Sequence, residues 1–213
     1  DNIPSRRILK AACDKLAIPY IYGAITGWTA QCALSLPGDG LLDILYPTDT
    51  VWGIGCDATN EEAVRRVFEI KKRADSKSLV LLASDLDMVA RYVKEIPSIA
   101  IDLVEVNDRP MTIVYPQGQL LAPSTLAADG SVGIRIPLND FCKELVKRLR
   151  HPLVSTSANV SGEPSPRCFK DIPQSIRDAM DYVVPRQLEA DSTGQASQIL
   201  KVGLKGEIEI IRA

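Results

Sequence analysis

The chain has 213 residues, of which 46% are hydrophobic, so it can build one domain with a large buried core, or a domain with an appendage. Its net charge of −2 and pI of about 5.5 argue against binding nucleic acid through overall charge, so any phosphate site must be local. Five scattered cysteines exclude a zinc-ribbon spacing and argue against a disulfide framework, and a single histidine excludes a multi-histidine metal site.

The sequence predicts neither a membrane span nor a signal peptide. No apolar run approaches the roughly 20 residues needed to cross a bilayer. Cysteine usage favours a reducing compartment, so we expect a cytoplasmic protein with no membrane partner. The one histidine, His151, is expected at the surface near a helix C-terminus. Chemistry should therefore rest on positioning and charge rather than on an imidazole.

Residues 1–40 form an N-terminal segment of uncertain origin. The residue pattern predicts a helix capped by Ser5, strands over 20–25 and 30–36, and a turn over 37–40. The opening Asp1-Asn2, Cys13 and the strand from Pro19 to Ala24 resemble a fragment of a ThiF/MoeB-type adenylyltransferase. The segment lacks that family's glycine-rich phosphate loop, so we assign it no adenylation activity. Residues 41–213 are predicted to form the main domain.

The main domain begins with a predicted strand over 41–45, a loop over 46–57 and a helix start at Thr59–Glu62, which is a capping-box pattern. Between its ends, over 48–55, the loop holds two threonines, Thr48 and Thr50, with one carboxylate and two glycines. Such a strand-end loop is where α/β proteins place ligands. The alternative is a plain connecting loop built from turn residues.

Strands and helices alternate through the rest of the chain. Further strands are predicted over 79–83, 111–115, 132–136, 153–155, 182–184, 198–200 and 208–211. Helices are predicted to start at 84–85, after Pro97, at Asn139 and near 172. This pattern predicts an α/β fold with a twisted, mixed, open sheet covered by helices.

Three further features could carry chemistry. Lys71, Lys72, Arg73 and Lys77 form a dense group of cations, which is either a solvated helix end or a triphosphate clamp. Arg135 lies in a strand otherwise built for burial, so we expect a ligand or carboxylate partner. Residues 155–162 carry four hydroxyls, an amide and a glycine, which could hold nucleotide oxygens or simply cap the next element.

Together these segments resemble the YrdC family, the threonylcarbamoyl-AMP synthases. The matching motifs occur in the family's order over about residues 41–212: 46–53, 71–77, 110–112, 132–137 and 155–162. The resemblance implies a twisted sheet that encloses a large concave, positively charged cavity. It also implies a nucleotidyltransferase that joins L-threonine, bicarbonate and ATP into threonylcarbamoyl-AMP and releases pyrophosphate.

The resemblance also implies roles for individual residues. Catalysis would fall to Lys71, Arg73 and Arg135. The threonine substrate would lie near Thr48, Thr50 and Arg135. ATP would be bound by Lys71, Arg73, Lys77, Thr112, Ser155, Ser157, Asn159, Ser197 and Arg212. No resident metal is implied, and Mg²⁺ would enter with ATP.

The implied partners are a tRNA threonylcarbamoyltransferase machinery and, less directly, tRNA itself. One departure from the family bears on function: Leu82 stands where many members have a histidine. It favours an alternative in which the protein is a non-catalytic, YrdC-like binder of nucleotide or RNA. A second alternative takes the N-terminal resemblance as primary and makes the chain part of a sulfur-carrier activating enzyme.

Overall fold

The computed structural model divides the chain into two compact units, residues 1–41 and 42–213. It describes residues 20–26, 29–35, 43–73, 78–189 and 192–213. In the first unit, β1 (Tyr20–Thr26) and β2 (Thr29–Ser35) pair as an antiparallel hairpin. Both strands predicted there are therefore confirmed. The predicted helix capped by Ser5 and the turn over 37–40 lie outside the described residues.

The second unit is built on a nine-stranded sheet with the order β11-β10-β6-β7-β5-β8-β4-β3-β9. The strands are β3 (Ile44–Pro47), β4 (Trp52–Gly55), β5 (Val80–Leu82), β6 (Met111–Tyr115), β7 (Val132–Arg135), β8 (Leu153–Ser157), β9 (Tyr182–Val183), β10 (Gln198–Val202) and β11 (Ile208–Arg212). Three neighbouring pairs are parallel: β3 with β9, β5 with β7, and β6 with β10. The other neighbours run antiparallel, which confirms the predicted mixed sheet.

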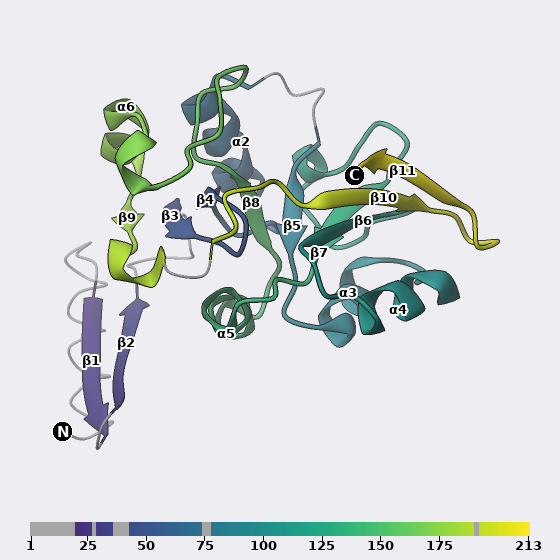
Figure 1. The fold of residues 1–213 in the computed structure, drawn as a ribbon, viewed down its shortest axis with the longest axis horizontal. Helices are drawn as coiled ribbons and strands as arrows, with labels where there is room; N and C mark the ends of the chain where they lie inside the picture. The colour runs from purple at the N-terminus through teal and green to yellow at the C-terminus, as the bar shows by residue number, and fades with distance from the viewer. Residues whose placement is uncertain (1–19, 27–28, 36–42, 74–77, 190–191) are drawn as a thin grey trace. The chain divides into compact units, whose positions relative to one another are not determined.

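Helices lie on both sides of this sheet (Figure 1). They are α2 (Glu61–Lys71), α3 (Leu86–Tyr92), α4 (Ser98–Glu105), α5 (Asp140–Leu149) and α6 (Gln174–Ala179). In the view of Figure 1, α2 and α6 lie above the sheet, whereas α3, α4 and α5 lie below it. Within the described residues, no helix is both long and apolar enough to cross a bilayer.

Side-chain caps fix where several helices begin. Asn139 caps α5, as the sequence predicts, and Asp85, one of the two residues predicted to start the next helix, caps α3. The predicted capping box at Thr59 is wrong by one residue, because Asn60 caps α2 by accepting from the backbone N–H groups of Glu62 and Ala63. The Thr59 hydroxyl instead donates to Asp57 at 2.7 Å.

The predicted loop over 46–57 is also wrong, because it contains strand β4. Residues 48–51 are a tight turn that joins β3 to β4, with Pro47 opposite Trp52. Glycine usually weakens a strand, which hides this element from a pattern analysis. At Gly55 a Cβ atom would lie 2.7 Å from Tyr46 Cε1 and 2.8 Å from the Val154 carbonyl oxygen. The glycine is thus required by close packing and does not mark a loop.

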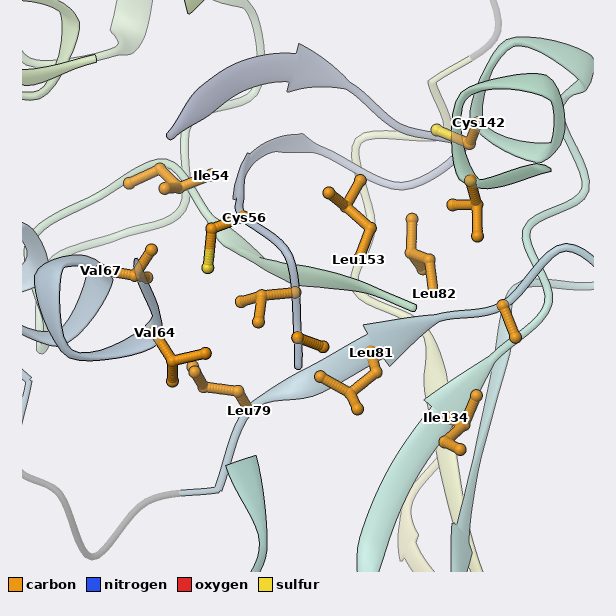
Figure 2. Close-up of a cluster of buried hydrophobic side chains, with 14 of the residues drawn as sticks. Ile54, Cys56, Val64, Val67, Leu79, Leu81, Leu82, Ile134, Cys142 and Leu153 are labelled. Atoms are coloured by element: carbon orange, nitrogen blue, oxygen red, sulfur yellow. The ribbon is translucent and has the colours of Figure 1, made fainter. Parts of the chain in front are cut away.

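The hydrophobic core packs the central strands against helices that include α2 and α5 (Figure 2). Val64 and Val67 of α2 are completely buried, as are Leu81 and Leu82 of β5. Figure 2 shows Leu82 among apolar neighbours that include Leu153 of β8. The leucine that departs from the family pattern is therefore a core residue.

Candidate functional site

The turn between β3 and β4 is held by its own hydroxyls. Thr48 Oγ1 accepts from the backbone N–H groups of Thr50 and Val51, at 3.0 and 3.2 Å, and donates to the Val51 carbonyl at 2.7 Å. The Thr50 hydroxyl lies 2.7 Å from Thr48 Oγ1, and either oxygen can be the donor in this contact. Thr48 is saturated inside the turn, and when Thr50 is the donor the Thr50 oxygen keeps acceptor capacity.

A buried ion pair attaches this turn to β7. Arg135 Nη1 lies 2.6 Å from Asp49 Oδ1, and the two side chains are only 3% and 5% exposed. The second carboxylate oxygen of Asp49 accepts from the Leu138 backbone N–H at 2.9 Å. Arg135 Nη1 also reaches Thr50 Oγ1 at 3.4 Å. The buried arginine thus has the anionic partner that its strand environment predicts, and that partner is a carboxylate of the chain.

Arg135 also retains unused donor capacity. Its Nε atom is buried and has no hydrogen-bond partner in the structure. A buried donor without a partner is costly, so such a group is a good candidate to meet a ligand. Arg212 lies near enough to affect this region: its pKa is lowered, mainly by burial and then by the positive charge of Arg135.

Arg212 joins two hydroxyl residues on neighbouring strands. Thr112 Oγ1 of β6 and Ser197 Oγ, just before β10, are 2.8 Å apart and buried. Arg212 of β11 donates from Nε to the Ser197 carbonyl at 2.8 Å and from Nη2 to Ser197 Oγ at 3.4 Å. The parallel pairing of β6 with β10 brings these residues together from positions 85 apart in the chain. The cluster offers hydroxyls beside two cations, which suits an anionic ligand.

The second cationic segment meets the Ser/Thr/Asn loop. Lys71, the last residue of α2, is 1% exposed. Its Nζ atom donates to the Ser157 carbonyl, to the Asn159 carbonyl at 2.7 Å and to Asn159 Oδ1 at 3.3 Å. The Ser157 hydroxyl donates to the same Asn159 Oδ1 at 2.5 Å. Lys71 is therefore not part of a solvated helix face.

Arg73 follows two residues later and is only partly buried. Its Nη2 donates to the Ser78 carbonyl at 2.8 Å. Burial lowers its pKa, although the group stays cationic because an arginine pKa starts so high. The third predicted cation, Lys77, lies outside the described residues.

Strands β4 and β8 connect the two groups of predicted residues. Ser157 of β8 stands opposite Gly53 of β4. A Cβ atom at Gly53 would lie 3.3 Å from Thr48 Cγ2, so Ser157 and the threonine turn flank one strand. Ser155 is buried in β8 opposite Val80. The turn at residues 48–51, Arg135 and the Ser157–Asn159 loop therefore gather around β4, β8 and β7, whereas Thr112, Ser197 and Arg212 lie towards the β6, β10 and β11 side of the sheet.

Two hollows lie in the described part of the chain, and the lining of the first contacts the turn at residues 48–51, where Ser192 Oγ and the Gly194 N–H donate to the Thr50 carbonyl. One, of about 720 Å³, is lined by Arg167, Cys168, Asp171 and residues 192–195. The other, of about 470 Å³, lies along the β10–β11 hairpin. None of the predicted site residues lines either hollow. The large concave cavity stays a prediction.

Sequence reasoning did not include Asp49 among the site residues. It noted the one carboxylate within 48–55 but gave it no partner, because nothing in the sequence links it to Arg135, 86 residues later. The only available signal was that a buried arginine requires a nearby anion. His151, by contrast, is half exposed and lies 2.7 Å from Asp57, just beyond the end of α5.

Comparison with known proteins gives consistent matches. The Sua5/YciO/YrdC family model, described as telomere recombination, matches residues 42–213. A threonylcarbamoyl-AMP synthase of Pseudomonas aeruginosa is 32% identical over 161 residues, which are 75% of this chain and 86% of the relative. The structure of Sua5 of P. abyssi complexed with L-threonine has a TM-score of 0.66 at 25% identity. That match covers 76% of this chain but about half, 47%, of the Sua5 chain. The E. coli YciO structure, at 18% identity and a TM-score of 0.66, covers 97% of this chain and 89% of its own, and shows the fold alone.

Proposed function

Because this chain belongs to the Sua5/YciO/YrdC family, we infer that it is a threonylcarbamoyl-AMP synthase, an enzyme of the nucleotidyltransferase type. The observation that carries this inference is the meeting of four distant motifs around β4, β8 and β7. Arg135 contacts the threonine turn, and Lys71 contacts the Ser157–Asn159 loop. A relative with this name is 32% identical over 161 residues.

The reaction has two bond-forming steps. The amine of L-threonine adds to the carbon of carbon dioxide, supplied by bicarbonate, and loses a proton to give a carbamate. A carbamate oxygen then attacks the α-phosphorus of ATP, and pyrophosphate leaves with the electrons of the broken P–O bond. Such a transfer needs positioning and charge stabilisation more than covalent help from the protein. A chain with one histidine, exposed and beyond the site, fits that requirement.

We assign the threonine substrate to the turn at residues 48–51. The Thr50 oxygen can still accept from the substrate ammonium, while Thr48 holds the turn in shape. The Nε atom of Arg135 has no hydrogen-bond partner, so we assign it to a carboxylate or phosphate of a bound substrate. The solved relative whose description includes L-threonine supports this substrate.

We assign ATP to the cations and hydroxyls of the other predicted segments. Arg73 and Lys77 would contact the phosphates, with Arg212 as a further cation. Nucleotide contacts would come from Thr112, Ser155, Ser157, Asn159 and Ser197. Mg²⁺ would enter with ATP and be held mainly by its phosphates. In the described residues no group of three or more His, Cys, Asp or Glu side chains forms a metal site.

The product has to be consumed by a second enzyme. A mixed carbamic–phosphoric anhydride is reactive, so we propose a tRNA threonylcarbamoyltransferase machinery as the partner that accepts it. Direct contact with tRNA and a cytoplasmic location are further parts of the proposal. A non-catalytic binder is not favoured, because the curated relatives that match most of the domain are synthases.

The test is pyrophosphate release from ATP by the purified full chain, with and without L-threonine and bicarbonate. We expect release only when both are present, together with a product of the mass of threonylcarbamoyl-AMP. Release that does not depend on threonine, or no release under any combination, would overturn the assignment. Serine and valine in place of threonine test whether both the hydroxyl and the methyl group are required.

A further inference from the structure

Lys71 belongs to the motif predicted to bind phosphate, but all three N–H donors of its ammonium group already have hydrogen-bond acceptors. A lysine ammonium has three N–H donors and no acceptor. In this structure three acceptors surround it: the Ser157 carbonyl, the Asn159 carbonyl and Asn159 Oδ1. The side chain is 1% exposed. A phosphate could reach this ammonium only if at least one of these bonds broke.

The backbone of Lys71 holds the same loop from its other side. The Lys71 carbonyl accepts from the Ser161 N–H at 2.8 Å. The loop is further attached to β4, since the Ala158 N–H donates to the Trp52 carbonyl at 2.9 Å. Inside the loop, the Asn159 side-chain N–H donates to the Glu163 carbonyl at 2.5 Å. The end of α2 and the loop over 157–163 therefore form one connected unit.

Arg73 differs from Lys71 in the respects that matter for a phosphate ligand. It is only partly buried, and its guanidinium carries five N–H donors in a planar fork that suits phosphate oxygens. The two cations of this motif are two residues apart, yet one is buried against the loop and the other is only partly buried. Their chemical roles should differ accordingly.

We propose that Lys71 is a positioning residue, which holds the Ser157–Asn159 loop in its binding arrangement, and that Arg73, not Lys71, contacts the triphosphate. The assignment of this loop to nucleotide rests on the proposed function, whereas the hold of Lys71 on the loop does not. In the described part of the chain Lys71 has no carboxylate partner, so carbonyl dipoles alone compensate its charge. Burial, and then the nearby Arg73, lowers the pKa of Lys71 to about 8.

The experiment compares four variants of the full chain. Lys71→Met removes the ammonium, and Lys71→Gln keeps two N–H donors without the charge. Arg73→Met removes the proposed phosphate ligand, and Lys72→Met is the matched control, because Lys72 is an exposed neighbour. Hydrogen–deuterium exchange reports on residues 157–163. Calorimetry with inorganic tripolyphosphate reports on phosphate binding without the nucleoside.

We expect Lys71→Met to speed exchange over 157–163 at least tenfold and to lower threonine-dependent activity, while its tripolyphosphate affinity stays within about twofold of wild type. Lys71→Gln should recover part of both the protection and the activity, because hydrogen bonds rather than charge hold the loop. Arg73→Met should leave the loop protected but weaken tripolyphosphate at least tenfold.

The proposal is overturned if Lys71→Met and Lys71→Gln weaken tripolyphosphate as much as Arg73→Met while the loop keeps its protection. Should Lys71→Met not fold, Lys71→Gln decides by the same two measurements. A wild-type chain that releases no pyrophosphate would overturn the proposed function. The exchange measurement on the ligand-free chain would still show whether Lys71 holds the loop.

Discussion

Asp49 and Arg135 form an ion pair with 2.6 Å between Oδ1 and Nη1, in a region where both side chains are almost fully buried. The pair connects the turn after β3 to the end of β7. Removing one partner leaves the other charge buried and uncompensated, which costs far more than loss of a surface pair. The ion pair, together with the Leu138 N–H bond to the same carboxylate, therefore fixes the turn relative to the strand.

Asp49→Asn should destabilise the protein by about 3–5 kcal/mol, because it leaves the buried charge of Arg135 without a counter-charge. Urea denaturation followed by tryptophan fluorescence measures this, since Trp52 lies in the adjoining strand. Glu144→Gln is the control, as it breaks the exposed Glu144–Arg148 pair on α5 and should leave the transition midpoint unchanged. Equal midpoints for Asp49→Asn and wild type would show that the pair contributes no net stability.

Arg73→Ala should lower threonine-dependent pyrophosphate release about 100-fold, by analogy with the loss of one donor that stabilises transition-state charge. Steady-state assays at saturating threonine and bicarbonate measure the change. Lys72→Ala is the control: it removes one positive charge from the exposed neighbouring residue and should retain activity close to wild type. Two variants with equal activities would remove the phosphate role from Arg73.

Thr48→Val should disrupt the turn, because the Thr48 hydroxyl accepts from the backbone N–H groups of Thr50 and Val51 and donates to the Val51 carbonyl. We expect a loss of about 1–3 kcal/mol in unfolding free energy, the cost of leaving buried donors unpaired. Thr48→Ser keeps the hydroxyl and should recover most of it. Thr50→Val leaves the Thr48 hydroxyl in place as the acceptor of the turn, so its main effect should be a higher KM for threonine. A Thr48→Val variant as stable as Thr48→Ser would contradict the turn assignment.

The sequence was sufficient for elements whose signals are local. Asp85 and Asn139 identify helix starts because their side chains cap the next turn, and apolar runs identify the central strands. It failed where packing decides: β4 contains two glycines, and only the proximity of Tyr46 and Val154 explains Gly55.

The candidate site shows the same division between local and tertiary information. A basic helix end looks the same in sequence whether its lysine is solvated or buried, so the contacts of Lys71 with a loop 86 and 88 residues away could not be foreseen. Arg135 was identifiable because it interrupts an apolar strand. Its partner Asp49 was not, because any of many carboxylates could have served.

Gly55→Ala should lower stability by about 1–3 kcal/mol, because the added methyl would overlap both a side chain and a backbone carbonyl of β8. The carbonyl of Val154 cannot move without disturbing the sheet. Gly133→Ala is the matched control in β7, since its nearest neighbour would be Thr112 Cγ2 at an ordinary 3.4 Å. Thermal unfolding compares the two. A smaller loss for Gly55→Ala than for Gly133→Ala would contradict the close-packing account.

The buried ammonium of Lys71 should make stability depend on pH above neutrality. Its pKa is lowered from 10.5 to about 8, chiefly by burial. Below pH 8 the lysine is protonated in both folded and unfolded chains, so the cost of burying the charge is fully present. Between pH 8 and 10.5 the unfolded chain holds more protons than the folded one, so the free energy of unfolding rises with pH.

We expect this rise to reach roughly 3 kcal/mol for wild type relative to Lys71→Met, from about 1.4 kcal/mol for each unit of pKa difference. Urea titrations of both proteins at roughly pH 7.5, 9 and 10.5 measure this difference in unfolding free energy. Buried tyrosine and cysteine groups, such as Tyr46 and Cys56, have raised pKa values and act in the opposite direction in both proteins. Subtracting one curve from the other removes their contribution. A difference that stays constant over this range would mean that the ammonium of Lys71 is not desolvated in the folded protein.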